Sequence, residues 1–163
     1  MTGAAPANAR RLPKGNTLPD FSIGQVFTHH WGRTLNEGDA TLFSTLTLSY
    51  NPHYFNAEFA RAHSHPGIIV NPMLVWLTVF GLSVEDLSEA GGLFLGTDAL
   101  TFHRDVYPGD TLTARSTVTA IRESVSRPNQ GIVTWHTEGF NQRGELVIDF
   151  HRTNLVAKRR DQA

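Results

Sequence analysis

The side chains best suited to acid–base chemistry lie around Asn51-Pro52. His53 carries an imidazole whose ordinary pKa is about 6.5, and Tyr54 carries a phenol whose ordinary pKa is about 10. The imidazole can exchange a proton near neutral pH, whereas the phenol is a weak base that is better suited to position water or to act as an acid. Neighbours in an extended loop point opposite ways, so both cannot face one substrate. Alternatively, His53 is a solvated loop residue and Tyr54 a packed aromatic ring.

Three polar side chains near this loop could hold water or a substrate oxygen. Ser49 and Asn51 precede Pro52, and Asn71 precedes Pro72. Each also has a purely local use, because Ser and Asn commonly bond their own backbone in loops. For Asn71 that local use is to cap a helix that has proline at its first position. The amino-acid types leave both uses open.

Several other kinds of site are disfavoured. The adjacent His29 and His30 would face opposite sides of a strand, and the pair His63 and His65 has no evident third ligand, so we expect no metal site. The chain has no cysteine, which excludes disulfides and thiolate chemistry. It also lacks a Gly-x-Ser-x-Gly elbow and a Gly-x-Gly-x-x-Gly phosphate loop.

The composition is typical of one globular domain. The 163 residues are 40% hydrophobic and 18% charged, which is enough for a core and excludes wholesale disorder. Lysine and arginine number 14 against 15 acidic residues, so we expect no nucleic-acid partner. The longest mostly apolar run, 73–80, is too short to cross a bilayer, and the start lacks the apolar segment of a signal peptide. We therefore expect a cytoplasmic protein with no membrane partner.

The hydrophobic pattern predicts a strand, several helices and then more strands. We expect a strand over 21–34, helices after the capping residues Asn36, Asn56, Asn71 and Ser83, and three or four long antiparallel strands between 93 and 156. The helix from Pro72 to about Phe80 is apolar on nearly all sides, which predicts burial all round. We assign residues 1–18 to a flexible tail, 19–157 to one domain and 158–163 to a charged tail.

The order of these features resembles the hot-dog fold, an α+β architecture in which an antiparallel sheet wraps round one buried central helix. More narrowly, it resembles the MaoC-like (R)-specific enoyl-CoA hydratase and dehydratase family over about 19–157, with a looser likeness to its mesaconyl- and itaconyl-CoA hydratase branch. The motifs that carry the resemblance are Asn51-Pro52, Phe59-Ala60, Asn71-Pro72 at the start of the helix, and Pro108-Gly109-Asp110.

This resemblance implies reversible hydration of a short α,β-unsaturated acyl-CoA thioester, and it leaves open whether the acyl group is branched or carboxylated. The family's loop reads Asp-x-Asn-Pro-x-His, and its Asp falls on Ser49 and its His on Tyr54. The candidate catalytic residues are thus Tyr54, Ser49 and Asn51, with His53 if the loop register shifts by one. The family's His-Gly pair falls on Asn71-Pro72. Because Pro72 has no N–H, the donor to the thioester oxygen would be Met73 or the Asn71 side chain.

The resemblance also implies partners and leaves alternative functions. Arg104 is a candidate for binding CoA phosphates, no cofactor beyond the CoA thioester is expected, and hot-dog relatives usually form homodimers through their sheet edges. A hot-dog thioesterase would usually need an acidic residue on the central helix, and 72–81 contains none. A non-catalytic acyl-CoA-binding protein is the other alternative.

Overall fold

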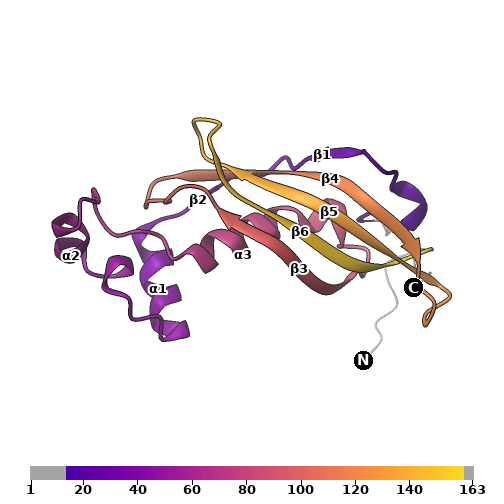
Figure 1. Ribbon diagram of the computed structural model, residues 1–163, viewed down its shortest axis with the longest axis horizontal. Coiled ribbons are helices and arrows are strands. Elements are labelled where there is room, and N and C mark those ends of the chain that lie inside the picture. Colours follow the sequence, from indigo (N-terminus) through magenta and orange to yellow (C-terminus); the bar gives the residue numbers. More distant parts are fainter. Residues whose placement is uncertain (1–13, 160–163) are drawn as a thin grey trace, which may run out of the picture.

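The computed structural model describes residues 14–159 and consists of one curved sheet that holds a helix in its concave face (Figure 1). The helices are α1 (Glu37–Thr47), α2 (Ala57–Ala62), α3 (Pro72–Leu82) and α4 (Val84–Leu87), with 3₁₀ turns η1 (Leu18–Asp20) and η2 (Pro52–Tyr54). The strands are β1 (Val26–Thr28), β2 (Arg33–Thr34), β3 (Leu93–Phe102), β4 (Thr111–Glu123), β5 (Gln130–Phe140) and β6 (Leu146–Ala157). No helix in this part of the chain is long and apolar enough to cross a membrane.

The sheet is antiparallel, as predicted, with the strand order β1-β4-β5-β6-β3 and β2 paired to the end of β4. Its inner face buries alternate residues, such as Leu112, Ala114 and Phe150, against Val75 and Val79 of α3. The helix approaches the sheet so closely at Gly139 that an added Cβ would lie 2.7 Å from side-chain atoms of Val79 and Ile148. This packing fixes where α3 begins relative to the strands.

Helix α3 is less buried than its composition predicts. Val75 and Val79 are fully packed, but Met73 and Leu77 on the opposite side are 41% and 47% exposed. Trp76 is only partly buried, with its ring edge-on to Phe150 of β6. The prediction of burial all round is therefore wrong, because the sheet covers one side of α3 and no second layer formed by residues 14–159 covers the other side.

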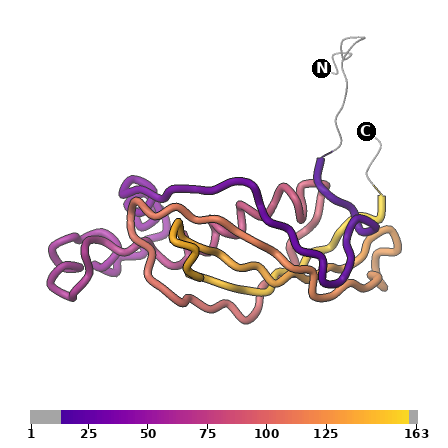
Figure 2. The backbone as a smooth tube through the Cα atoms, turned by 90° about the horizontal axis from the view of Figure 1, so that it is seen from above, coloured from indigo at the N-terminus to yellow at the C-terminus, as the bar shows by residue number. Residues whose placement is uncertain are grey.

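The capping predictions for the first two helices are confirmed. Asn36 accepts a hydrogen bond from the backbone N–H of Asp39, whose carboxylate returns one from the Asn36 N–H, and Asn56 caps α2 through the N–H of Phe59. Helices α1 and α2 lie beyond one end of the sheet, next to the start of α3 (Figures 1 and 2). The loop that contains Ser49 and Tyr54 connects these two helices, so it also lies at this end.

Two boundaries differ from the prediction. The strand expected over 21–34 is interrupted, since only Val26–Thr28 and Arg33–Thr34 pair with β4. The end of the predicted N-terminal tail packs on the domain: Asn16 donates to the carbonyl of Asp86, and Leu18 contacts the core around Trp135. Residues 1–13 of that tail, and 160–163 of the C-terminal one, lie outside the described residues.

Candidate active site at the start of the central helix

Asn71 organises the start of α3. Its side-chain Oδ1 accepts a hydrogen bond from the Met73 N–H at 2.9 Å, and its Nδ2 donates to the Ser49 hydroxyl oxygen at 2.9 Å. Asn71 is only 4% exposed, so both contacts are shielded from bulk water. The residue is therefore a helix cap and, at the same time, a link to the loop that follows α1.

The backbone of this helix start has no free donor for a substrate oxygen. Pro72 has no N–H, the Met73 N–H is bonded to the Asn71 side chain, and the Leu74 N–H is bonded to the Asn71 carbonyl at 2.9 Å. The predicted role of Met73 as a backbone donor is therefore not available in this arrangement. Beside the helix start, the Asn71 side chain keeps a second Nδ2 hydrogen and the Ser49 side chain keeps its hydroxyl hydrogen.

A depression of about 380 Å³ lies directly over these donors. It brings together four of the predicted site residues, Ser49, Tyr54, Asn71 and Met73. Its other lining residues are Phe43, Thr47 and Pro72. The lining is thus apolar with three hydroxyl groups and one amide, a combination that can orient a neutral oxygen but contains no carboxylate or imidazole.

Asn51 and His53 lie elsewhere. The loop forms the 3₁₀ turn η2 and not the extended segment that the sequence suggested, and Asn51 caps this turn by accepting hydrogen bonds from the His53 N–H and Nδ1. The His53 imidazole packs against the rings of Phe59, His63 and His65, at centroid distances of 5.0, 5.3 and 5.6 Å. This places His53 in an aromatic cluster between η2 and α2, apart from the lining of the depression with Ser49 and Tyr54.

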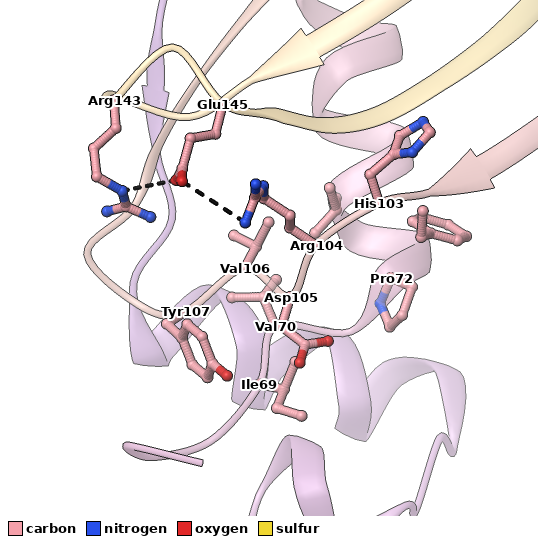
Figure 3. A pocket seen from close by; sticks show the side chains of 12 residues that line it. Ile69, Val70, Pro72, His103, Arg104, Asp105, Val106, Tyr107, Arg143 and Glu145 are labelled. Carbon is pink, nitrogen blue, oxygen red and sulfur yellow. Dashed lines mark hydrogen bonds and ion pairs between the residues drawn. The ribbon is translucent and has the colours of Figure 1, made fainter.

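A second depression of about 580 Å³ also meets the start of α3, and Pro72 lines both depressions. Figure 3 shows the residues that line this second depression. Its apolar lining comes from Ile69, Val70, Val75 and Val106. Its rim carries the charged and polar residues His103, Arg104, Asp105, Tyr107, Arg143 and Glu145. Arg104 therefore lines a different depression from Ser49 and Tyr54 of the predicted catalytic loop.

Glu145 is the centre of this rim. It accepts hydrogen bonds from Asn141 Nδ2 and Arg143 Nε, both at 2.8 Å, and its other oxygen lies 3.7 Å from Nη1 of Arg104. The hydrogen bonds from Asn141 and Arg143 lower the pKa of the Glu145 carboxyl. Sequence reasoning missed Arg143 and Glu145, because the segment 141–145 has only the pattern of a hairpin turn.

Tyr107 and His103 also line this depression. The Tyr107 hydroxyl lies 3.0 Å from Nδ1 of His65, and burial, followed by the nearby charges of Asp105 and Asp110, raises the pKa of Tyr107. The phenol therefore stays protonated at neutral pH. His103 pairs with the Asp149 carboxylate at 2.7 Å, which engages its Nε2 outside the depression.

Two other arginines that could have met CoA phosphates are already engaged. Arg115 forms two hydrogen bonds to Glu138 across the β4–β5 pair. Arg152 is 1% exposed, bonds to Asn154, Ser83 and Ser88, and stacks on the ring of Phe80. Among residues 14–159, no group of three or more His, Asp or Glu side chains could hold a metal ion.

Comparison with solved structures defines the class of this domain. It superposes on a putative MaoC domain protein dehydratase from Chloroflexus aurantiacus with a TM-score of 0.86 and 33% identity, over 95% of this chain and 44% of that one. A Mycobacterium tuberculosis protein described as having a double hotdog fold matches with a TM-score of 0.75 and 27% identity, over 91% of this chain and 46% of that one. The domain is a MaoC-like hot-dog domain, as predicted.

Sequence comparison narrows the class to a family. The chain matches mesaconyl-CoA hydratase over residues 5–163, and it is 38% identical to the mesaconyl-CoA hydratase of Haloarcula marismortui over 151 residues. The chain belongs to the mesaconyl-CoA hydratase family. That alignment covers 92% of this chain but 42% of the archaeal protein, so the chain spans less than half the length of this relative.

Proposed function

We propose that this chain catalyses the reversible addition of water to the double bond of a short, branched or carboxylated acyl-CoA thioester. The observation that carries the proposal is the depression at the start of α3, where the Asn71 amide and the Ser49 hydroxyl lie together. Family membership supports the same reaction.

The Asn71 and Ser49 donors take the thioester oxygen. As water adds to the β-carbon, electron density moves to this oxygen, and hydrogen-bond donors fixed beforehand stabilise the enolate-like state. Asn71 is held by its bond to the Met73 N–H, so its second Nδ2 hydrogen has a defined direction. Ser49 accepts from Asn71, which leaves its own hydrogen available.

The Tyr54 hydroxyl holds the water and relays its proton: as the water oxygen bonds the β-carbon, the water gives a proton to the Tyr54 oxygen and the phenol gives its own hydrogen to the α-carbon, so that Tyr54 ends neutral. In the resemblance to the wider MaoC-like family, Tyr54 falls at the position of the usual histidine and Ser49 at that of the usual aspartate, so the site that we propose uses a neutral phenol and a neutral hydroxyl. General acid–base groups contribute typically about 10²–10⁴-fold to a rate. We therefore expect turnover that is slow for this family and that depends on Tyr54.

The proposed partner is a second copy of this chain, which pairs along the free edge of β3. This edge strand exposes Leu93, Phe94, Leu95 and Phe102 by 38–53%, an unusual amount of apolar surface for an unpaired edge. Pairing would join the two sheets and cover these side chains. Sedimentation should therefore give a dimer, and Leu95→Lys should shift the equilibrium toward monomer.

The proposed site needs no cofactor, because the thioester itself activates the α-carbon. The proposed compartment of the protein is the cytoplasm. The test is to incubate the purified protein with mesaconyl-CoA, itaconyl-CoA and crotonyl-CoA and to follow loss of the conjugated thioester. We expect hydration of at least one ester that is abolished or strongly reduced in Asn71→Ala. Rates equal to the buffer rate for all three would contradict the proposal.

The neutral lining of the depression supports one second candidate, an acyl-CoA-binding protein without turnover. This function requires only the donors and the apolar wall, and it needs no base. Calorimetry distinguishes the two functions: tight binding of an unsaturated acyl-CoA that remains chemically unchanged would favour the binding protein. Release of free CoA thiol would instead identify a thioesterase, although α3 carries no acidic residue.

A further inference from the structure

The depression lined by Ile69, Val70, Val75 and Val106 combines an apolar lining with a charged rim (Figure 3). A purely aliphatic acyl chain would use the lining but would gain nothing from the guanidinium groups above it. A short acyl group that ends in a carboxylate would use both parts. The rim carries two arginines, Arg104 and Arg143, and either could bind such a carboxylate if its guanidinium group is free.

The Arg143 guanidinium is already engaged. Its Nε donates to Glu145 at 2.8 Å, and its Nη1 lies 3.6 Å from the carboxylate of Asp110. Both carboxylates are fixed in turn, Glu145 by Asn141 and Asp110 by the Gln142 side chain at 2.7 Å. Arg143 thus belongs to a closed network around the β5–β6 turn.

The Arg104 guanidinium is available. Within residues 14–159, its one contact with a charged group is the approach of Nη1 to Glu145 at 3.7 Å, which is too long for a hydrogen bond. None of the hydrogen bonds in this part of the chain uses the guanidinium N–H groups of Arg104. The side chain is 56% exposed, so a ligand can reach it. Glu145 attracts Arg104 and holds it over the rim while leaving its paired donors for another carboxylate.

The surrounding charges favour a carboxylate over a CoA phosphate. Asp105 and Glu145 lie on the same rim as Arg104 and Arg143, so the rim carries equal numbers of acidic and guanidinium groups. His103, which also lines it, is bound to Asp149. A phosphate monoester, with a charge near −2, would be repelled by these two carboxylates. A substrate carboxylate carries less charge, and it can form two parallel hydrogen bonds with the planar guanidinium of Arg104.

The depression that Arg104 lines also adjoins the proposed active site. Pro72 lines both depressions, so an acyl chain whose thioester oxygen is held by Asn71 can pass over Pro72 and lie on Val75. We propose that Arg104 binds the free carboxylate of a dicarboxylic acyl-CoA and that the apolar lining of this depression receives its methyl branch. This inference rests on the proposed function and assigns the residue of this chain that distinguishes an acyl-CoA with a free carboxylate from one without it.

The test compares mesaconyl-CoA, which carries a free carboxylate, with crotonyl-CoA, which does not. In Arg104→Gln, the ratio of kcat/KM for mesaconyl-CoA to kcat/KM for crotonyl-CoA should fall by about 10- to 100-fold, the loss expected for hydrogen bonds between charged groups. Arg104→Lys, which keeps the charge but not the fork, should lose only part of this ratio. Arg115→Gln is the matched control, because Arg115 pairs with Glu138 away from the depression, and it should keep the wild-type ratio.

A third substrate separates the two possible anions. The N-acetylcysteamine thioester of mesaconic acid has the carboxylate but no CoA phosphates, and Arg104→Gln should impair its turnover as well. If the variant instead impairs both CoA esters equally and spares this thioester, Arg104 binds phosphate and the inference is wrong. An unchanged ratio would also overturn it.

If the wild-type protein hydrates none of these esters, the proposed function fails but the inference can still be tested. Calorimetry of the full chain should then show that Arg104→Gln weakens binding of mesaconyl-CoA by about 10- to 100-fold more than binding of crotonyl-CoA. Equal weakening of the two would contradict the carboxylate assignment.

Discussion

The Asn71 side chain donates a hydrogen bond of 2.9 Å to the Ser49 hydroxyl, 22 residues earlier in the chain. This contact joins the start of the central helix to the loop that follows α1. The same amide group caps the helix through the Met73 N–H. Stability and the proposed chemistry therefore depend on one side chain, which gives the first prediction.

Asn71→Ala should lower both stability and turnover. Loss of a cap costs about 0.5–2 kcal/mol, and the donor to the substrate oxygen is removed with it. Asn56→Ala is the control, because Asn56 also caps a helix, through the Phe59 N–H, but is not in the depression. Denaturant unfolding and steady-state kinetics should show a stability loss for both variants and a turnover loss for Asn71→Ala alone. Equal turnover in the two variants would mean that Asn71 is only a cap.

Tyr54→Phe should reduce turnover by about 10²–10⁴-fold while the melting temperature stays close to that of the wild type. The substitution removes one hydroxyl and keeps the ring that lines the depression. Tyr50→Phe is the matched control, since Tyr50 is 64% exposed and its ring contacts Phe55 outside the depression. If Tyr54→Phe retains full activity and His53→Ala abolishes it, His53 is the base despite its place in the aromatic cluster.

The beginnings of the first three helices were predictable because capping is a local interaction. Ser83 does precede α4, but the prediction that it caps this helix is wrong, because its hydroxyl donates to the Phe80 carbonyl of α3 instead. Asn36, Asn56 and Asn71 each bond a backbone N–H two or three residues further on, so the sequence contains both partners. The contact between Arg104 and Glu145 was not predictable, because it depends on how the end of β3 meets the β5–β6 turn. Likewise, the separation of His53 from Tyr54 depends on a 3₁₀ turn that the expected extended loop did not include.

The exposure of Trp76 changes what its replacement should cost. A fully buried tryptophan replaced by alanine typically loses about 3–5 kcal/mol. Trp135 of β5 is 0% exposed and should lose an amount in this range, whereas Trp76 is partly buried and should lose less. Denaturant unfolding of Trp76→Ala and Trp135→Ala measures the difference. A larger loss at Trp76 would indicate that something else, such as a second copy of the chain, covers it in solution.

Acid should destabilise the fold through His29. Its side chain is buried, and this burial lowers the pKa of the imidazole in the folded state, although the carboxylate of Asp86 at 2.6 Å opposes the effect. The unfolded chain therefore binds a proton more readily, with an ordinary pKa of about 6.5. The stability that neutral His29 provides is present above this value and is lost as the pH falls through the lower pKa of the folded state.

Melting temperatures measured between about pH 7.5 and about pH 5 test this prediction, because this range runs from about one unit above to about one and a half units below the ordinary histidine pKa. The wild type should lose stability across the lower half of this range, and His29→Gln should show a flatter profile. His30→Gln, at a neighbouring position with a side chain that is 58% exposed, should keep the wild-type slope. If the melting temperature falls equally with pH in all three proteins, His29 does not cause the loss of stability in acid.

The central claim is that the depression beside Asn71 adds water to an unsaturated acyl-CoA. The most direct test is to incubate the full chain with mesaconyl-CoA in isotopically labelled water and to analyse the thioester by mass spectrometry. We expect a hydrated acyl-CoA that carries one labelled oxygen, and the same final ratio of enoyl to hydroxyacyl ester when the reaction starts from the hydrated compound. Two results would contradict the proposed hydration. One is mesaconyl-CoA that stays unlabelled and unchanged at enzyme concentrations that bind it fully, and the other is labelled free mesaconate with release of CoA.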